Sequence, residues 1–127
     1  MILASGCFDG LHAGHVRYLQ AAAEMGQPLI VAVAPDAYIV QAKHRKPYWT
    51  QVDRALTVKA LAMVDSVYVQ TTFTAAEAIR ELKPAVFVKG MDWMGKLPPD
   101  VVVACSQVGA RVVFTATECR HTSEAIA

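Results

Sequence analysis

The chain has 127 residues, of which 54% are hydrophobic and 18% are charged, and its formal net charge is +1. A mean hydropathy of +0.31 excludes an intrinsically disordered chain, and the near-neutral charge excludes the broad positive field that attracts nucleic acid. No apolar run approaches the roughly 18 residues that span a membrane. We therefore expect one globular domain, residues 1–127, with neither a membrane nor a nucleic-acid partner.

The cysteines and the first residues indicate the compartment. Cys7, Cys105 and Cys119 are odd in number and far apart, and no CxxC pair occurs, so neither a disulfide framework nor a zinc site is expected. Residues 5–15 are polar and glycine-rich where a signal peptide would be apolar. These features predict reduced thiols in a cytoplasmic protein.

Short apolar segments alternate with helix-forming segments along the whole chain. The predicted strands cover residues 2–5, 29–34, 66–69, 85–88 and 111–115. The predicted helices cover residues 13–26, 35–42, about 51–63, 74–83, 100–108 and 122–127. This alternation predicts an α/β fold, a single doubly wound Rossmann-like domain with a parallel sheet of about five strands.

The first turn carries three glycines and two histidines at the point where the first strand meets the first helix. Ligands bind at this carboxyl end of a strand in open α/β sheets, and a helix N-terminus offers free N–H groups to an anion. His12 and His15 could also hold a metal or only cap the helix, but no third ligand is nearby in the sequence. Gly14 lets a phosphate approach the backbone, so we favour a phosphate-handling site.

Three segments resemble a known family. Residues 6–15 (Gly-Cys-Phe-Asp-Gly-Leu-His-Ala-Gly-His) resemble the HxGH signature of the cytidylyltransferase-like nucleotidyltransferases. Residues 89–93 (Lys-Gly-Met-Asp-Trp) resemble the Lys-Gly-Gly-Asp-Tyr of heptose 1-phosphate adenylyltransferase domains. Residues 92–96 (Asp-Trp-Met-Gly-Lys) are similar to the Asp-Trp-Glu-Gly-Lys of glycerol-3-phosphate cytidylyltransferase, and residues 118–126 resemble the closing Glu-Gly-x-Ser-Thr-Thr segment of both.

The resemblance implies an HxGH-type fold and nucleotidyl transfer. A phosphate oxygen of a small phosphorylated sugar or polyol attacks the α-phosphate of ATP or CTP, pyrophosphate leaves, and Mg²⁺ accompanies the nucleotide without protein ligands. The implied catalytic residues are His12, His15, Lys43 and Lys46. The implied nucleotide-binding residues are Gly6, Cys7, Phe8, Asp9, Gly14, Lys89, Gly90, Asp92, Thr122 and Ser123. The implied substrate-binding residues are Arg54, Trp93 and Arg120.

Several alternatives stay open. Either lysine of the basic loop 43–47 matches the lysine that lies over the phosphates, and Arg54 binds substrate phosphate or pairs with a neighbouring acid. Trp93 contacts substrate or only packs. The closing segment reads Cys-Arg-His-Thr-Ser at 119–123 in place of Gly-x-Ser-Thr-Thr, which weakens the cytidylyl assignment.

The preferred prediction is therefore a sugar-phosphate adenylyltransferase. The alternatives are a glycerol-3-phosphate-type cytidylyltransferase and a nucleotide-binding module without catalysis. Since relatives are often dimers, a homodimer is also a possible assembly.

Overall fold

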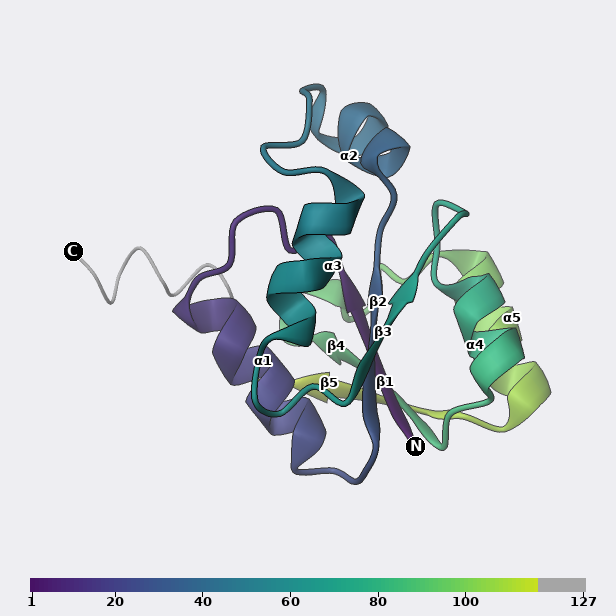
Figure 1. The fold of residues 1–127 in the computed structure, drawn as a ribbon. Helices are drawn as coiled ribbons and strands as arrows, with labels where there is room; N and C mark the ends of the chain where they lie inside the picture. Colours follow the sequence, from purple (N-terminus) through teal and green to yellow (C-terminus); the bar gives the residue numbers. More distant parts are fainter. Residues whose placement is uncertain (117–127) are drawn as a thin grey trace.

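The computed structural model describes residues 1–116, which fold around one sheet of five parallel strands (Figure 1). The strands lie in the order β3-β2-β1-β4-β5. Their bounds are β1 Ile2–Gly6, β2 Leu29–Val33, β3 Ser66–Val69, β4 Val86–Gly90 and β5 Arg111–Thr115. The chain winds outward from β1 through β2 to β3, then returns to the other side of β1 for β4 and β5. The predicted doubly wound α/β sheet is confirmed.

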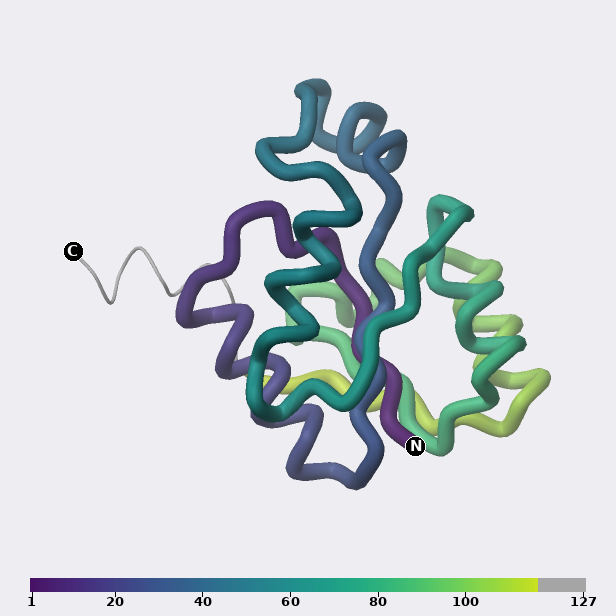
Figure 2. The backbone as a smooth tube through the Cα atoms, in the orientation of Figure 1, coloured from purple at the N-terminus to yellow at the C-terminus, as the bar shows by residue number. Residues whose placement is uncertain are grey.

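Helices cover both faces of this sheet (Figures 1 and 2). Helices α1 and α3 lie on one face, α4 and α5 on the other, and α2 stands beyond the carboxyl ends of the strands. Their bounds are α1 Ala13–Ala23, α2 Asp36–Lys43, α3 Gln51–Lys59, α4 Ala76–Leu82 and α5 Pro99–Val108, and a short 3-10 turn, η1, covers Met91–Trp93. No helix within residues 1–116 is long and apolar enough to cross a membrane.

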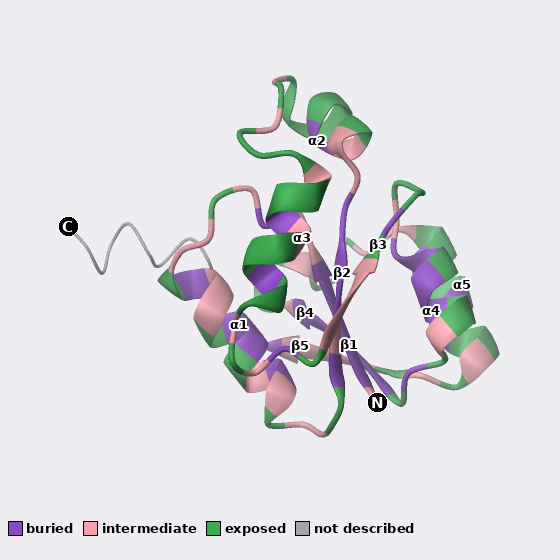
Figure 3. Ribbon diagram, in the orientation of Figure 1, coloured by how far each residue is buried: buried purple, intermediate pink, exposed green. Residues whose placement is uncertain are grey.

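The central strands β1, β2 and β4 are buried on both faces because their side chains alternate between two apolar clusters, whereas the edge strands β3 and β5 are only partly buried (Figure 3). In β1, Ile2 and Ala4 pack toward α1 and α3, whereas Leu3 packs toward α4 and α5. Both faces are therefore closed to ligands, and the carboxyl edge of the sheet remains available for a site.

Three helices are shorter than the sequence predicts. Helix α1 ends at Ala23 rather than at residue 26. Helix α3 ends at Lys59 rather than near residue 63, because the chain turns there to start β3; Leu61 and Met63 still pack on the core from this turn. Val52 and Leu56 of α3 are 74% and 67% exposed, so the apolar residues of this helix do not all face the sheet. Helix α4 begins at Ala76, two residues later than predicted. The predicted helix 122–127 lies outside the described residues.

Candidate functional site

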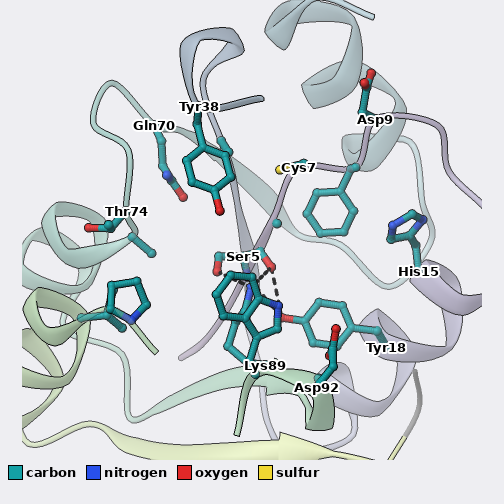
Figure 4. Close-up of a pocket in the computed structure, with 18 of the residues that line it drawn as sticks. Ser5, Cys7, Asp9, His15, Tyr18, Tyr38, Gln70, Thr74, Lys89 and Asp92 are labelled. Atoms are coloured by element: carbon teal, nitrogen blue, oxygen red, sulfur yellow. Dashed lines mark hydrogen bonds between the residues drawn. The ribbon is translucent and has the colours of Figure 1, made fainter. Parts of the chain in front are cut away.

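A cavity of about 490 Å³ opens at the carboxyl edge of the sheet, where β1 and β4 part (Figure 4). The pairing of β1 with β4 ends at Ala4 and Val88, although β1 continues along β2 to Gly6. This is the point at which the strand order reverses, the place where open α/β sheets bind ligands. The cavity is lined by the first turn, by α2, by the segment after β3 and by the segment after β4.

The two histidines of the first turn cap α1 and line the cavity at the same time. The Nδ1 atom of His12 accepts a hydrogen bond from the Gly14 amide at 3.0 Å, and the Nδ1 atom of His15 accepts one from the His12 amide at 3.2 Å. Because an accepting Nδ1 carries no proton, the neutral ring carries its proton on Nε2. The capping bonds therefore set both imidazoles as Nε2–H donors.

His15 is held in its neutral form. Burial, together with the positive potential of His12 and Lys43, lowers the pKa of His15 to about 4. The two imidazole rings lie 3.9 Å apart between centroids. At neutral pH His15 therefore acts as a hydrogen-bond donor without carrying a charge.

Phe8 supports this pair from the side. Its ring centroid lies 5.4 Å from that of His15, and its backbone has a φ of 53°. A Cβ atom at Gly6 would lie 3.0 Å from two carbons of the Phe8 ring. Glycine at this position therefore lets the Phe8 ring pack closely against the end of β1.

Asp9 holds the basic loop 43–47 and the residues after it against the first turn. Its carboxylate accepts hydrogen bonds from the Arg45 guanidinium at 2.8 Å and from the amides of Tyr48 and Trp49 at 2.9 and 3.0 Å. Burial pushes the pKa of Asp9 upward, but the Arg45 guanidinium and the two amides outweigh it and hold the pKa below its usual value. Arg45 also stacks on the Tyr48 ring, 3.9 Å from its centroid.

Side chains fill the gap where β1 and β4 separate. The Tyr18 hydroxyl donates to the Val88 carbonyl at 2.5 Å and accepts from the Ser5 amide at 3.3 Å. The Lys89 ammonium donates to the Ser5 carbonyl at 3.1 Å and lies 4.5 Å from the centroid of the Trp93 ring. Tyr18 and Lys89 thus satisfy backbone groups that the sheet leaves unpaired, and they place a cation at the floor of the cavity.

The Cys7 thiol lines the cavity in its protonated form. Burial raises its pKa, although the nearby cations of Lys43, Arg54 and Lys89 oppose this shift. Since the thiolate is the nucleophile, the site does not activate Cys7 for covalent chemistry.

Most of the predicted site residues meet in this cavity. Those that line it are Gly6, Cys7, Phe8, Asp9, His12, His15, Lys43, Lys89, Gly90, Asp92 and Trp93. Gly14 is buried behind them and donates its amide to His12. Of the two candidate lysines, Lys43 lines the cavity and Lys46 does not.

Arg54 does not line the cavity. Its guanidinium is fully buried and donates to Asp36 at 2.7 Å, to the Cys7 carbonyl at 2.7 Å and to the Trp49 carbonyl at 3.0 Å. The pairing with an acid, one of the two alternatives for Arg54, is present in the structure. The remaining candidates, Arg120, Thr122 and Ser123, lie outside the described residues.

The structure adds lining residues that the sequence reasoning missed. They include Ser5, Tyr18, Tyr38, Gln70, Phe73 and Thr74. Gln70 directly follows β3 and Tyr38 lies on the helix after β2, so the rule that ligands bind at the carboxyl ends of strands was a usable signal for both.

The donor set of the cavity fits phosphate. Lys43, Lys89 and two imidazole N–H groups face it, and the Asp9 carboxylate is occupied by the basic loop. In residues 1–116, no group of three or more His, Cys, Asp or Glu side chains is placed to hold a metal ion.

Comparison with known proteins agrees with this geometry. A family model described as cytidylyltransferase-like matches residues 3–124. The protein "Bifunctional protein HldE" of Wolinella succinogenes is 45% identical over 97 residues, which are 76% of this chain and 20% of that protein. The protein of the same name from Streptomyces coelicolor is 37% identical over 128 residues, covering all of this chain and 28% of that protein.

The chain thus matches only 20% and 28% of the length of these two curated relatives. Among solved structures, a lipopolysaccharide core biosynthesis protein from Thermoplasma volcanium superposes with a TM-score of 0.77 at 24% identity, covering 92% of this chain and 96% of that one. At this identity the likeness concerns the fold. The family match over nearly the whole chain confirms the prediction from the first turn: the chain belongs to the cytidylyltransferase-like family of nucleotidyltransferases.

Proposed function

We propose that this domain transfers a nucleoside monophosphate, preferably AMP from ATP, to a small phosphorylated sugar or polyol. An oxygen of the acceptor phosphate forms a bond to the α-phosphorus, the bond from that phosphorus to the pyrophosphate oxygen breaks, and pyrophosphate leaves with the electron pair. The acceptor oxygen is already ionised, so the reaction needs no protein nucleophile. Asp9 is accordingly a residue that orders the turn.

The histidine pair carries this proposal. Both imidazoles are fixed as Nε2–H donors by their capping bonds, and both line the cavity together with Lys43. Donors fixed before the reaction stabilise the charge that develops on the pentavalent phosphorus without reorganising. We place the α-phosphate at these donors, with Lys43 beside it.

The Mg²⁺ ion that such reactions use enters, in this proposal, with the triphosphate. The ion would neutralise the leaving pyrophosphate, and the nucleotide phosphates would be its main ligands. The chain's own part is then to hold the phosphates through Lys43, His12 and His15.

The preference for ATP rests on residues 89–93, which resemble the heptose adenylyltransferase motif, and on the HldE relatives. Asp92, Trp93, Gly95 and Lys96 instead resemble the glycerol-3-phosphate cytidylyltransferase, so CTP is the second candidate. Pyrophosphate release with each nucleotide, measured against a panel of sugar and polyol phosphates, decides between them.

Variants of His12 and His15 test the proposed catalysis. Asparagine keeps a side-chain acceptor for helix capping, so His12→Asn and His15→Asn should fold while losing the Nε2–H donor. We expect pyrophosphate release to fall about 10²–10³-fold in each, the usual effect of removing one fixed donor to a developing charge. His44→Asn is the matched control, because His44 lies outside the cavity with a left-handed backbone that asparagine tolerates.

Undiminished release in the two site variants would refute this assignment. Tight nucleotide binding by the unaltered domain without release on any acceptor would instead favour the non-catalytic module.

A further inference from the structure

A single hydroxyl group connects three elements at the floor of the cavity. Tyr18 lies on α1, yet its side chain reaches the place where the pairing of β1 with β4 ends, and it lines the cavity. Its hydroxyl donates to the Val88 carbonyl of β4 at 2.5 Å and accepts from the Ser5 amide of β1 at 3.3 Å. Helix α1, β1 and β4 are therefore joined through one oxygen atom.

The Tyr18 proton decides which group the Ser5 carbonyl accepts from. The hydroxyl also lies 3.3 Å from the Ser5 carbonyl, but it has one proton to donate, and the Val88 carbonyl is closer. The Ser5 carbonyl is thus available to the Lys89 ammonium at 3.1 Å, and the Ser5 hydroxyl lies 3.4 Å from the same ammonium. In Figure 4, Tyr18 from α1 and Lys89 from β4 both reach toward Ser5.

The two strand ends that Tyr18 joins lead to separate parts of the site. Ser5 directly precedes the first turn, which carries the histidines, and Val88 directly precedes Lys89. Lys89 is only 8% exposed, and its ammonium lies against the Trp93 ring as well as against Ser5. A small change in the spacing of the two strand ends would therefore move a buried cation relative to the first turn.

Tyr18 also fixes the helix that carries the histidine pair. His15 and Tyr18 are three residues apart on α1, so their side chains lie on the same face of the helix. Tyr18 and Leu19 are buried in the apolar cluster between α1 and the sheet. Apolar packing is non-directional, whereas the hydrogen bond from Tyr18 to Val88 fixes where α1 lies along β4. The His15 imidazole, one turn earlier, is held in place by the same bond.

We propose that Tyr18 is a positioning residue for nucleotidyl transfer, whose hydroxyl holds the Lys89 ammonium and the histidine turn at the separation that one bound nucleotide requires. This inference rests on the proposed function, in which the histidines face the α-phosphate. Tyr18 acts through Ser5 and Lys89 and needs no contact with the nucleotide. Because a displacement of about 1 Å can reduce a rate about 100-fold, one hydroxyl at this junction is sufficient for a large effect.

Tyr18→Phe tests the role, because it keeps the ring in the apolar core and removes only the hydroxyl. Binding of the α,β-methylene analogues of ATP and CTP, which cannot release pyrophosphate, is measured calorimetrically well below the melting temperature. We expect the Kd of the tighter analogue to rise about tenfold, the effect of about one hydrogen bond, and the kcat of pyrophosphate release to fall about 10–100-fold. Tyr68→Phe is the matched control, because the Tyr68 hydroxyl bonds to Glu81 outside the cavity.

A second substitution distinguishes positioning from a general loosening of the fold. Lys89→Met removes the ammonium that Tyr18 positions. Tyr18→Phe should then raise the Kd of the analogue about tenfold in the native chain but no more than about threefold in the Lys89→Met chain, because interacting residues are not additive. A tyrosine that only packs would give the same loss in both chains.

The kinetics of Tyr18→Phe give an independent criterion if Lys89→Met does not fold. Loss of folded protein lowers the apparent kcat in proportion to the inactive fraction and leaves the KM of the nucleotide unchanged. Loss of positioning lowers kcat in the fully folded domain and raises the KM of the nucleotide together with the Kd of the analogue.

The outcomes separate the role of Tyr18 from the reaction itself. Unchanged Kd and kcat in folded Tyr18→Phe, or equal losses in the native and Lys89→Met chains, would overturn the positioning role and leave the proposed catalysis intact. Coupling between the two variants without pyrophosphate release on any acceptor would support the role of Tyr18 in nucleotide binding and refute the proposed catalysis. A native chain that binds neither analogue would overturn both.

Discussion

Asp9→Asn should loosen the basic loop from the first turn. In the native chain one carboxylate oxygen accepts from Arg45 and from the Tyr48 amide, and the other accepts from the Trp49 amide. The carboxylate is 2% exposed, so water does not readily replace these bonds. Asparagine keeps one oxygen, and its NH₂ group must then face a donor.

The expected cost follows from these three bonds. Losing the charge weakens the two bonds to the remaining oxygen, and one amide is left without its acceptor at a cost of about 1–3 kcal/mol. Since Trp49 is largely exposed, its amide regains some hydration, and we expect a total loss of about 2–3 kcal/mol. For a domain of this size the melting temperature should fall by about 6–12 °C.

Thermal unfolding at several pH values provides the assay. The lowered pKa of Asp9 means that its contribution is present above its unfolded pKa of about 3.9 and is lost as the pH falls through the folded value. The difference between the native chain and Asp9→Asn should therefore be full at pH 7 and shrink toward pH 3. Asp53→Asn, an exposed acid in the first turn of α3, is the control. A loss no larger than that of Asp53→Asn would refute the reasoning.

Three further predictions concern the residues around the first turn. Arg54→Met should destabilise the domain by about 3 kcal/mol in urea unfolding, because it removes a buried guanidinium and leaves the Cys7 and Trp49 carbonyls without their donor. A stable variant that loses acceptor affinity would instead assign Arg54 to the substrate. His15 should titrate near pH 4 by NMR. As the pH decreases from about 6.5 to about 4, the unfolded chain takes up a proton on His15 and the folded chain does not, so the stability should fall over this range. His15→Gln should flatten that slope, and a titration near pH 6.5 would contradict the burial argument. Gly6→Ala should lower the free energy of unfolding by about 1–3 kcal/mol, because the added methyl group contacts the Phe8 ring. Phe8→Leu in the same chain should restore part of this loss. Unchanged stability of Gly6→Ala would show that the Phe8 ring moves aside without cost.

Patterns within single segments were enough to predict the architecture. The five apolar runs became the five strands within two residues at each end, because parallel strands buried on both faces leave a continuous apolar signal. The first turn was identified by its glycines and histidines for a similar reason, since every group that it needs is contiguous in the chain. The larger misplacements are at helix ends, where turns such as that after Lys59 depend on the next strand.

Contacts between distant segments required the tertiary structure. The charge pattern made Arg45 as available to phosphate as Lys43, and the family resemblance made Arg54 a further candidate. Only the fold pairs Arg45 with Asp9 and Arg54 with Asp36. Gln70 and Tyr38 carry no motif, and they join the site because the sheet order places the ends of β2 and β3 beside the end of β1. The sequence by itself determined the sheet and the phosphate-facing turn through local periodicity and spacing. The fold decided which charges are neutralised and which side chains complete the cavity, because both depend on long-range packing.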